Sequence, residues 1–501
     1  MQFMKGAVYL IGAGPGDPGL LTLRGAELLG KADVVLYDGL SNPDLLSHAP
    51  QAEQICVGKH GKSRIWKQNE IIDEILRHAK AGKNVVRLKG GDPAVFARTA
   101  EEAEAVLKED LPLEIVPGIT AALAAGAFAG IPITHRGLAS AVALVTGHEE
   151  PSKSKSALDW DALARFPGTL VIYMGVTTAN SWTQALLRAG KAADTPAALI
   201  RRCSLPDQQT IHCRLDEVAD QLNPASRFRP PAIVILGAVT QLAKTMNWIK
   251  DRPLLDQTVL VTRPRGQAKS LAGLLRDLGA RVLLQPAITI EPPEDWQQVD
   301  LALDQLSEYE MLIFCSHNGV HFFLNRLEER GNDMRALAGI EIGCIGRKTA
   351  NALQRFHLQS DILPNTFHAE AMAEHIGQHA AGKRIMVIRA SRGNDVLAKQ
   401  LAAWGGKVTE VIAYQHIDVM ECDAMVQQTA KDGEIDWVTV TSSATAQSLH
   451  RMFPESLTNM KIASLSPVTS RTLSDLGHTV AAEADPYTIE SLVEVLVKAN
   501  Q

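Results

Sequence analysis

Residues 8–23 read Val-Tyr-Leu-Ile-Gly-Ala-Gly-Pro-Gly-Asp-Pro-Gly-Leu-Leu-Thr-Leu. An apolar run rich in strand-forming residues stops at alternating glycines, and leucines then recur at helical spacing, so the stretch predicts a strand, a tight loop and a helix. Glycines let a chain approach a ligand closely and adopt positive φ, and a following helix end offers unpaired N–H groups. The pattern therefore fits either a loop that binds a nucleotide-like ligand or a tight turn of an α/β fold.

A dinucleotide-binding fold is the obvious alternative for this stretch. Asp38 follows the apolar run 32–37, near the distance expected of a ribose-binding acid. The loop, however, reads G-x-G-P-G-D instead of G-x-G-x-x-G. Pro15 and Pro18 also lack the N–H groups that a pyrophosphate would need. The spacing therefore argues against a dinucleotide site.

Length and composition indicate a folded, multi-domain protein. The chain has 501 residues, of which 46% are hydrophobic and 21% charged, and both fractions are ordinary for globular cores. Its six cysteines form no C-x-x-C pair, so we expect no disulfide framework and no bound metal, and a cytoplasmic location. Residues 1–5 lead straight into the first expected strand, which leaves no room for a secretory signal.

Charge and hydropathy exclude two classes of partner. The formal net charge is −6, and without a basic excess we expect no nucleic-acid binding. The most apolar tract, residues 119–133, is too short to span a bilayer and predicts a buried helix instead. We therefore expect no membrane role, and an anionic substrate would have to be held by local arginine and lysine side chains.

Strand-like runs alternate with helical patterns along the chain, which predicts α/β layers with largely parallel sheets. The pattern pauses at residues 250–253, and a fresh strand is expected from residue 258. We place the main domain boundary there. The strand-like runs of the first half are residues 8–11, 34–37, 85–88, 142–146, 170–173 and 233–236.

The second half contains an internal repeat. Val-Thr-Arg-Pro-Arg-Gly at 261–266 is echoed at 387–393, and Phe-Cys-Ser-His-Asn at 314–318 is echoed at 440–444, both at an offset of 126 residues. Two similar α/β lobes explain the repeat. Each echo places small polar residues directly after an apolar strand, where open α/β sheets bind ligands, so a cleft between the lobes is the expected site.

The first half carries an ordered set of motifs that resembles the uroporphyrinogen-III C-methyltransferases of the tetrapyrrole methylase family, across roughly residues 5–248. The resemblance implies two α/β lobes, about 1–117 and 118–248 within a domain 1–248, with S-adenosylmethionine bound in the cleft. The motifs are G-A-G-P-G-D-P-G-L-L-T at 12–22, Y-D at 37–38, V-G-K at 57–59, V-V-R-L-K-G-G-D-P at 85–93, V-P-G-I-T-A-A at 116–122, G-I-P-I-T-H-R at 130–136, V-T-G-H at 145–148 and Y-M-G at 173–175.

The second half, residues 254–501, resembles uroporphyrinogen-III synthase through sparser motifs. The resemblance implies two lobes joined by two crossovers, lobe one being about 254–290 plus 416–501 and lobe two about 291–415. The motifs are V-T-R-P at 261–264, S-x-N-G-V at 316–320, I-G-x-K-T-A at 345–350, Y-Q at 414–415 and T-S-S-A at 441–444.

The methyltransferase resemblance implies roles for individual residues. Asp38 would accept a proton or stabilise the macrocycle, which becomes transiently cationic during carbon methylation, and Lys59 would donate a proton or anchor the substrate. Cys203 stands where relatives tend to place a glycine close to the cofactor, and Gly39 where an arginine often follows Y-D. The implied cofactor contacts are Pro15, Gly90, Gly91, Asp92, Val95, Thr120, Ala121, Met174 and Cys203, and the implied anchors for substrate carboxylates are Arg98, His135 and Arg136.

In the synthase half the implied reaction closes linear hydroxymethylbilane with inversion of ring D, and no cofactor is needed. The protein mainly has to hold a reactive chain in the correct geometry. Tyr414 matches the Y-Q position, and its phenol can assist the loss of hydroxide. The residues at expected strand ends that can hold substrate carboxylates are Arg263, Ser316, Asn318, Lys348, Ser442, Ser443 and Thr469.

Together the two resemblances imply a fused enzyme of tetrapyrrole biosynthesis. Its second half would make uroporphyrinogen III, and its first half would methylate that product at carbons 2 and 7 to give precorrin-2, on the route to sirohaem and cobalamin. Family habit implies a homodimer through the methyltransferase half. The alternative is an active methyltransferase fused to a non-catalytic module that binds tetrapyrroles.

Overall fold

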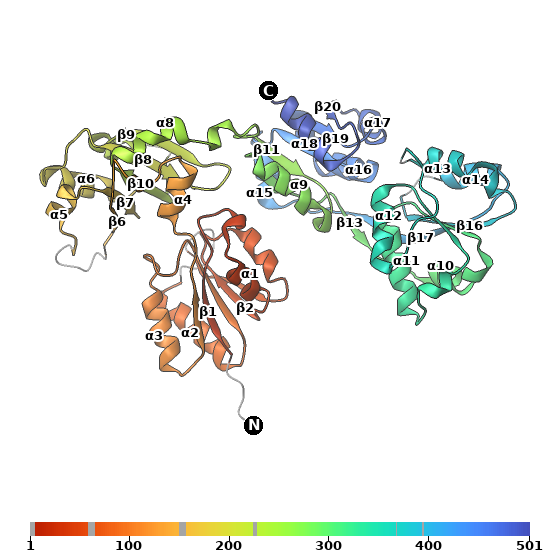
Figure 1. The fold of residues 1–501 in the computed structure, drawn as a ribbon, viewed down its shortest axis with the longest axis horizontal. Helices are drawn as coiled ribbons and strands as arrows, with labels where there is room; N and C mark the ends of the chain where they lie inside the picture. Colours follow the sequence, from red (N-terminus) through yellow and green to blue (C-terminus); the bar gives the residue numbers. More distant parts are fainter. Residues whose placement is uncertain (1–5, 59–65, 150–156, 224–227, 367, 393–394) are drawn as a thin grey trace. The chain divides into compact units, whose positions relative to one another are not determined.

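The computed structural model describes residues 6–58, 66–149, 157–223, 228–366, 368–392 and 395–501. Contacts divide the chain into two compact units, Met1–Asp256 and Gln257–Gln501, and each unit contains two five-stranded sheets (Figure 1).

The first sheet of the first unit is parallel throughout, in the order β3-β2-β4-β1-β5. Alternate residues of a strand face opposite sides, so Val8 and Leu10 pack against α2 while Ile11 packs against α1. Burial on both faces explains why the central strands read as continuous apolar runs. The elements are β1 (Val8–Gly12), α1 (Leu23–Leu29), β2 (Val34–Tyr37), β3 (Glu53–Cys56), α2 (Gln68–Lys80), β4 (Val85–Lys89), α3 (Thr99–Lys108) and β5 (Leu113–Val116).

The second sheet of this unit departs from the expectation of parallel strands. Its order is β6-β7-β10-β8-β9, and only β6 and β7 pair in parallel. The expected alternation of strands and helices, which predicts parallel pairing, fails here, because β8 and β9 follow each other without an intervening helix. The elements are α4 (Ala121–Phe128), β6 (Val142–Thr146), α5 (Trp160–Arg165), β7 (Thr169–Tyr173), α6 (Ala179–Arg188), β8 (Pro196–Arg201), β9 (Gln209–Arg214), α7 (Val218–Gln221), β10 (Ala232–Leu236) and α8 (Ala243–Met246).

Helix α4 is the helix expected in the apolar tract 119–133, and it is shorter than that tract. It ends at Phe128, and its alanines pack with the inward residues of β7, β8 and β10. The opposite face of the sheet packs on α6 through Trp182 and Leu186. This sheet therefore also has helices on both faces.

The second unit consists of two similar sheets, as the internal repeat predicts. One has the order β12-β11-β18-β19-β20 and the other β13-β17-β16-β14-β15, so β11, β12, β18 and β19 correspond to β16, β17, β14 and β15. Only the added edge strand β13 is antiparallel to its neighbour. Both β13 and the end of β17 belong to the second sheet, a few residues outside the range expected for that lobe.

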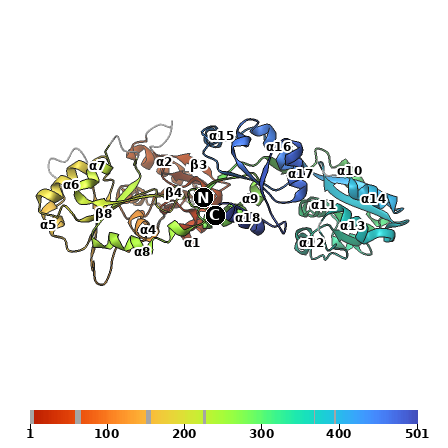
Figure 2. The same cartoon turned by 90° about the horizontal axis from the view of Figure 1, so that it is seen from above.

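Helices cover both faces of the second sheet. Residues Leu312 and Phe314 of β14 face α11, whereas Met311 and Ile313 face the other side, and α11 lies beside α12 in both views (Figures 1 and 2). The strands are β11 (Thr258–Val261), β12 (Arg281–Leu284), β13 (Ile288–Glu291), β14 (Met311–Phe314), β15 (Glu341–Cys344), β16 (Arg384–Ala390), β17 (Lys407–Asp418), β18 (Trp437–Val440), β19 (Lys461–Ser464) and β20 (Val480–Glu483). The helices are α9 (Arg265–Asp277), α10 (Gln297–Asp304), α11 (His317–Glu329), α12 (Arg347–Leu353), α13 (Ala369–Ile376), α14 (Val396–Ala403), α15 (Ala424–Lys431), α16 (Ser443–Met452), α17 (Pro467–Asp475) and α18 (Ile489–Lys498).

Candidate functional site

Glycines bring three strand ends of the first sheet into direct backbone contact. Gly14 and Gly91, after β1 and β4, exchange N–H···O hydrogen bonds of 3.1 and 2.8 Å, and both have positive φ, +72° and +70°. A Cβ atom on Gly118, after β5, would lie 2.2 Å from the Gly91 carbonyl oxygen. Only glycine permits this approach, so the three motifs that the sequence analysis singled out form one junction beside Pro15 and Gly90.

Asp92 fixes the loop that follows Gly91. One carboxylate oxygen accepts the Ala94 N–H at 2.6 Å, and the other accepts the Gly118 N–H at 2.9 Å. These hydrogen bonds join the ends of β4 and β5, so Asp92, an expected cofactor contact, organises the junction.

Tyr173, at the end of β7, connects the second sheet to the start of α4. Its hydroxyl group lies 2.6 Å from Thr120 Oγ1 and accepts the Ala122 N–H at 2.9 Å. The Phe96 ring packs on the Tyr173 ring with 5.0 Å between centroids. Burial raises the pKa of the Tyr173 phenol. Tyr173 contacts one expected cofactor contact, Thr120, and directly precedes another, Met174, but was not itself predicted as a site residue.

Residues with strained backbones gather in the loops that carry the expected cofactor contacts. Eight non-glycine residues of the described ranges have positive φ, and five of them lie in the loops that carry the expected cofactor contacts. Such conformations cost about 1–3 kcal/mol each and concentrate at ligand sites. Met174 is one of them, and its apolar side chain is 49% exposed, which suits a ligand contact. The five are Phe96, Arg98, Met174, Arg202 and Ser204.

The loop between β8 and β9 covers the first glycine loop. The Asp17 N–H donates to Ser204 Oγ at 3.0 Å, and a Cβ atom on Gly16 would lie 2.8 Å from the Leu205 side chain. Cys203 is 6% exposed and packs in the apolar cluster of α4, which also contains Val95 and Ala121. Burial raises the pKa of its thiol to about 12, so the thiol is neutral and occupies space beside Ala121.

Asp38 lies at the end of β2, where two groups hold its carboxylate. Arg87 of β4 donates a hydrogen bond to one oxygen, and the Gly90 N–H donates to the other at 3.3 Å. The Asp38 side chain is 31% exposed and that of Arg87 only 4%. Asp38 therefore has a fixed orientation and an accessible edge. Lys59, its expected partner in catalysis, lies outside the described residues.

The hydrogen bonds to Asp38 continue into a buried network of charges. Arg87 Nε lies 3.4 Å from Glu102 of α3, and Lys89 Nζ lies 2.6 Å from the other oxygen of Glu102. The Glu102 and Lys89 side chains are 0% and 2% exposed, and desolvation lowers the pKa of Lys89. In the sequence, this network is marked only by Arg87 and Lys89, which alternate with apolar residues in β4. No role was predicted for either residue.

The expected substrate anchors of the first unit lie at its surface. Arg98 is exposed and pairs with Glu101 at 2.7 Å, and it is one of the strained residues beside Phe96. His135 and Arg136 are exposed in a turn closed by mutual backbone hydrogen bonds between His135 and Ala139.

In the second unit, Tyr414 lies buried at the bend of β17. Its hydroxyl group is 2.7 Å from Ser316 Oγ, and its ring stacks on Phe322 with 5.7 Å between centroids. Burial raises the pKa of the phenol, whereas hydrogen bonds to Ser316 and Asn318 oppose that rise. Tyr414 is thus a neutral hydroxyl group at the edge of a pocket of about 270 Å³, which Ser316, Arg389, Arg392, Glu410 and His416 also line.

Three expected anchors of this unit lie at the N-terminal ends of α16 and α17. Ser442 Oγ accepts the Thr445 N–H at the start of α16, and Ser443 accepts a hydrogen bond from the Thr472 hydroxyl group at 2.8 Å. Thr469 is 2% exposed, and its hydroxyl group lies 3.1 Å from Ser466 Oγ. Ser442 and Ser443 remain partly accessible, whereas Thr469 is inside the protein.

Arg263 and Lys348, the two expected cationic anchors, come from different lobes and lie close to His317. Arg263 is 7% exposed, and its Nη2 donates to Gln267 Oε1 at 3.0 Å. The Gln267 amide nitrogen lies 3.4 Å from His317 Nε2. Desolvation, Lys348 and Arg263 contribute to a His317 pKa of about 4. His317 was not among the expected site residues.

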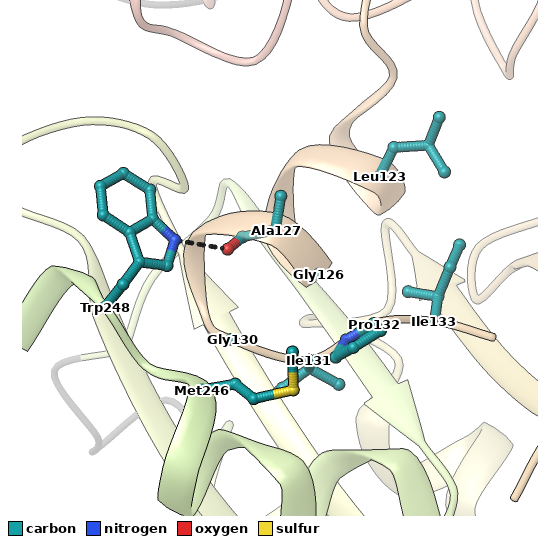
Figure 3. A pocket seen from close by; sticks show the side chains of 9 residues that line it. All are labelled: Leu123, Gly126, Ala127, Gly130, Ile131, Pro132, Ile133, Met246 and Trp248. Atoms are coloured by element: carbon teal, nitrogen blue, oxygen red, sulfur yellow. Dashed lines mark hydrogen bonds between the residues drawn. The ribbon is translucent and has the colours of Figure 1, made fainter. Parts of the chain in front are cut away.

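A separate, apolar pocket of about 330 Å³ lies beside α4 (Figure 3). Trp248 closes one side, and its indole N–H donates to the Ala127 carbonyl oxygen at 3.0 Å. Leu123, Met246 and Trp248 are each about half exposed. The pocket offers no titratable group and is therefore a packing surface instead of a reaction site.

In the described ranges, no helix is both long and apolar enough to cross a bilayer. No three histidine, cysteine, aspartate or glutamate side chains of these ranges gather as metal ligands would.

The fold and the site define a class of protein: two fused α/β units, the first with a glycine-lined strand-end site and the second with two similar sheets and a polar pocket beside Tyr414. The comparison with protein families agrees with this division into two different units. Residues 7–219 match the model of the tetrapyrrole (corrin/porphyrin) methylases, and residues 269–494 match that of uroporphyrinogen-III synthase HemD.

Relatives match both halves. "Porphyrin biosynthesis protein HemD" of Ruminiclostridium josui is 34% identical over 97% of this chain and 95% of its own length. A uroporphyrinogen-III C-methyltransferase of Bacillus subtilis is 37% identical over 67% of this chain and 69% of its own length. A uroporphyrin-III C-methyltransferase structure from Thermus thermophilus, complexed with S-adenyl homocysteine, is 45% identical, covers 47% of this chain and all of its own, and has a TM-score of 0.42. The chain belongs to the family of fused tetrapyrrole methylase and uroporphyrinogen-III synthase proteins.

Proposed function

We propose that this chain is a bifunctional enzyme that catalyses two consecutive steps of tetrapyrrole synthesis. The second unit cyclises hydroxymethylbilane to uroporphyrinogen III with inversion of ring D. The first unit transfers two methyl groups from S-adenosylmethionine to carbons 2 and 7, which gives precorrin-2 for the sirohaem and cobalamin routes. The names of relatives that match each half support this assignment.

The observation that carries the methyltransferase proposal is the fixed carboxylate of Asp38 beside the glycine junction. Arg87 and the Gly90 N–H orient it, and its exposed edge remains available. Methylation of a pyrrole carbon leaves the macrocycle cationic until a proton departs. A carboxylate held in place can stabilise that charge and accept the proton. We assign Lys59 the complementary role of proton donor or anchor.

We assign S-adenosylmethionine to the glycine junction of the first unit. Its walls are backbone and small residues at Gly90, Gly91 and Ala121, with the exposed Met174 on one side. S-adenosylmethionine supplies an activated methyl group, so the chain itself has only to position donor and acceptor. Arg98, His135 and Arg136 are the proposed anchors of substrate carboxylates. The guanidinium groups of Arg98 and Arg136 can pair with a carboxylate in bidentate fashion, and the His135 imidazole can donate a hydrogen bond to one.

For the synthase half, the proposal rests on the neutral Tyr414 hydroxyl group and the polar side chains around it. The phenol donates a hydrogen bond to the departing hydroxyl group of the bilane, and Ser316 and Asn318 hold the phenol in place. Ring closure then depends on the geometry in which the bilane is held. No cofactor takes part in this assignment.

We further propose that the chain forms a homodimer in the cytoplasm through its first unit. The half-exposed Leu123, Met246 and Trp248 around the apolar pocket provide a surface that a second copy can cover (Figure 3), since such patches mark association sites. Leu123→Asp should shift the mass measured by light scattering from dimer to monomer. An unchanged mass would place the interface elsewhere.

The substitution Asp38→Asn tests the methyltransferase proposal, because it keeps the size of the side chain and removes its charge. We expect methylation of uroporphyrinogen III to fall at least about 100-fold, while the Kd for S-adenosylmethionine, measured by calorimetry, stays within a factor of two. Asp73→Asn is the matched control, since Asp73 is exposed on α2, and it should keep full activity. Normal turnover in Asp38→Asn would remove Asp38 from the chemistry.

A further inference from the structure

The guanidinium group of Arg87 is held between two carboxylates in the first unit. Its Nη2 donates to Asp38, and its Nε lies 3.4 Å from Glu102. Its Nη1 donates to the Leu88 carbonyl oxygen at 3.2 Å. Lys89 Nζ donates to the second oxygen of Glu102 at 2.6 Å. All three guanidinium nitrogens are therefore engaged, which fixes the position of Arg87 beside Asp38.

Stability alone does not explain the ion pair of Glu102 and Lys89. The two side chains are 0% and 2% exposed, and Gln68 of α2 also donates to Glu102 at 3.0 Å. Taking two charges out of water costs free energy that their attraction often does not return, and apolar residues of similar size commonly leave a protein equally stable. A buried ion pair one contact away from a site carboxylate therefore points to a use in the site.

The four charges of the group balance while Asp38 is ionised. Arg87 and Lys89 are positive, and Glu102 and Asp38 are negative. Desolvation lowers the pKa of Lys89, whereas the charges of Glu102 and Asp38 oppose that change. Glu101, at the surface of α3, also interacts with Lys89. Because an interaction between two charges acts on both, removing Lys89 or Glu102 changes the charge balance around the Asp38 carboxylate.

We propose that Glu102 and Lys89 are positioning residues for methyl transfer, which act through Arg87 on Asp38. The Glu102 carboxylate lies closer to Lys89 than to Arg87, so the guanidinium group stays committed to Asp38. The proposal rests on the methyltransferase function proposed above and adds two residues to it. Both residues control the orientation and the charge balance of the carboxylate that accepts the proton.

The test measures methylation of uroporphyrinogen III by the full chain as a function of pH, under anaerobic conditions. Glu102→Gln and Lys89→Met keep the size of each side chain and remove charges of opposite sign. Loss of a positive charge makes protonation of a nearby carboxylate easier, so the acid limb of the kcat profile should move to higher pH in Lys89→Met. In Glu102→Gln it should move to lower pH. We expect each shift to be about half a pH unit or more.

The other kinetic parameters separate positioning from binding. At the plateau of the profile, kcat should fall about tenfold in both variants because Arg87 is no longer fixed. KM and the Kd for S-adenosylmethionine should stay within a factor of two of the wild-type values. An ion pair with a purely structural role would lower kcat or stability and leave the acid limb in place.

The double variant Glu102→Gln/Lys89→Met removes the ion pair and keeps the charge balance, so its acid limb should return to the wild-type position. If Glu102→Gln alone does not fold, the comparison of Lys89→Met with the double variant still decides the inference. Glu104→Gln and Lys108→Met are matched controls, because both residues are exposed on α3. They should leave the profile unchanged.

A second measurement decides the inference without turnover. In protein labelled with ¹³C at the aspartate carboxyl carbons, the NMR signal of Asp38 is identified by its absence in Asp38→Asn. Its titration midpoint should move in opposite directions in Glu102→Gln and Lys89→Met, as the acid limb does.

The two proposals fail in different ways. A wild-type chain that does not methylate uroporphyrinogen III would overturn the methyltransferase function, and the NMR titration would still decide the role of the ion pair. A chain that methylates uroporphyrinogen III, while Lys89→Met leaves both the acid limb and the NMR midpoint unchanged, would overturn the positioning role and leave the methyltransferase function in place.

Discussion

Glu102 pairs with two buried cations, Arg87 and Lys89, both at most 4% exposed. Glu102→Gln would remove the counter-charge that Lys89 contacts and leave Arg87 paired with Asp38 alone. Removing one partner of a buried ion pair costs about 3–5 kcal/mol. We expect the free energy of unfolding, measured in urea, to fall by about that amount.

The neighbouring Glu101→Gln is the control for this prediction. Glu101 pairs with Arg98 at the surface, where both side chains are about half exposed, and surface pairs contribute about 0–1 kcal/mol. Equal losses in the two variants would contradict the importance of burial and show that the Glu102 network is not a stabilising unit.

Tyr173→Phe should weaken the cofactor site without unfolding the protein. The change removes one hydroxyl group that bonds both Thr120 and the Ala122 N–H, and leaving a buried donor unsatisfied costs about 1–3 kcal/mol. We expect the Kd for S-adenosylmethionine to rise about tenfold or more by calorimetry, because α4 begins at these residues. An unchanged Kd would remove the start of α4 from the proposed site.

Site residues differ in how far the sequence predicts them. Gly91 and Gly118 were predictable, because only glycine permits their close approach and they stand in recognisable loops. Tyr173 and Glu102 were not, because their partners lie 53 and 13 residues away and meet them only after the sheets have formed. Lone aromatic or acidic residues on apolar strands and helices have no local signature of such contacts.

Among the elements, the end of β17 connects the two lobes of the second unit. Asp418 accepts hydrogen bonds from Arg392 at 2.6 Å and from Ser448 of α16, and it pairs with Arg451 at 2.8 Å. The hydrogen bond from Arg392 is the main cause that lowers the Asp418 pKa to about 2. Because the folded value lies below the unfolded one, this stabilisation is complete above about pH 4 and disappears as the pH falls towards 2.

Asp418→Asn should therefore destabilise the second unit in a pH-dependent way. We expect a loss of about 2 kcal/mol at pH 7, measured by urea unfolding, and a difference from wild type that shrinks as the pH falls from 4 to 3. Asp333→Asn is the control, because Asp333 pairs with Arg335 at an exposed site and should change little. A loss independent of pH would mean that Asp418 acts through packing alone.

The strands of the first unit also differ in how far the sequence predicts them. The runs at β1, β2, β4, β6, β7 and β10 are apolar and β-branched, and the structure confirms a strand at each. β3, β5, β8 and β9 were not predicted. β3, β5 and β9 are edge strands, and the sequences of β3 and β9, Glu-Gln-Ile-Cys and Gln-Thr-Ile-His-Cys-Arg, mix polar and apolar residues. Edge strands bury little surface and so carry weak periodicity. The antiparallel pairing of β8, β9 and β10 depends on tertiary contacts in the same way.

At the scale of the whole molecule, the repeat at an offset of 126 residues corresponds to two sheets of matching strand order. The division into Met1–Asp256 and Gln257–Gln501 gives each proposed activity its own core. We therefore expect the activities to be separable in the full chain. Asp38→Asn should still convert hydroxymethylbilane to uroporphyrinogen III at the wild-type rate, as judged by chromatography of the oxidised product. A lost synthase activity would contradict independent units.

The most direct test of the account is anaerobic incubation of the whole protein with hydroxymethylbilane and methyl-labelled S-adenosylmethionine, with mass spectrometry and isomer analysis of the products. The account predicts a type-III product that carries two labelled methyl groups. A type-III product without label would leave the synthase half alone active. An unmethylated type-I product, which forms from the bilane without enzymatic ring inversion, would contradict both assignments and favour a second unit that binds tetrapyrroles without acting on them.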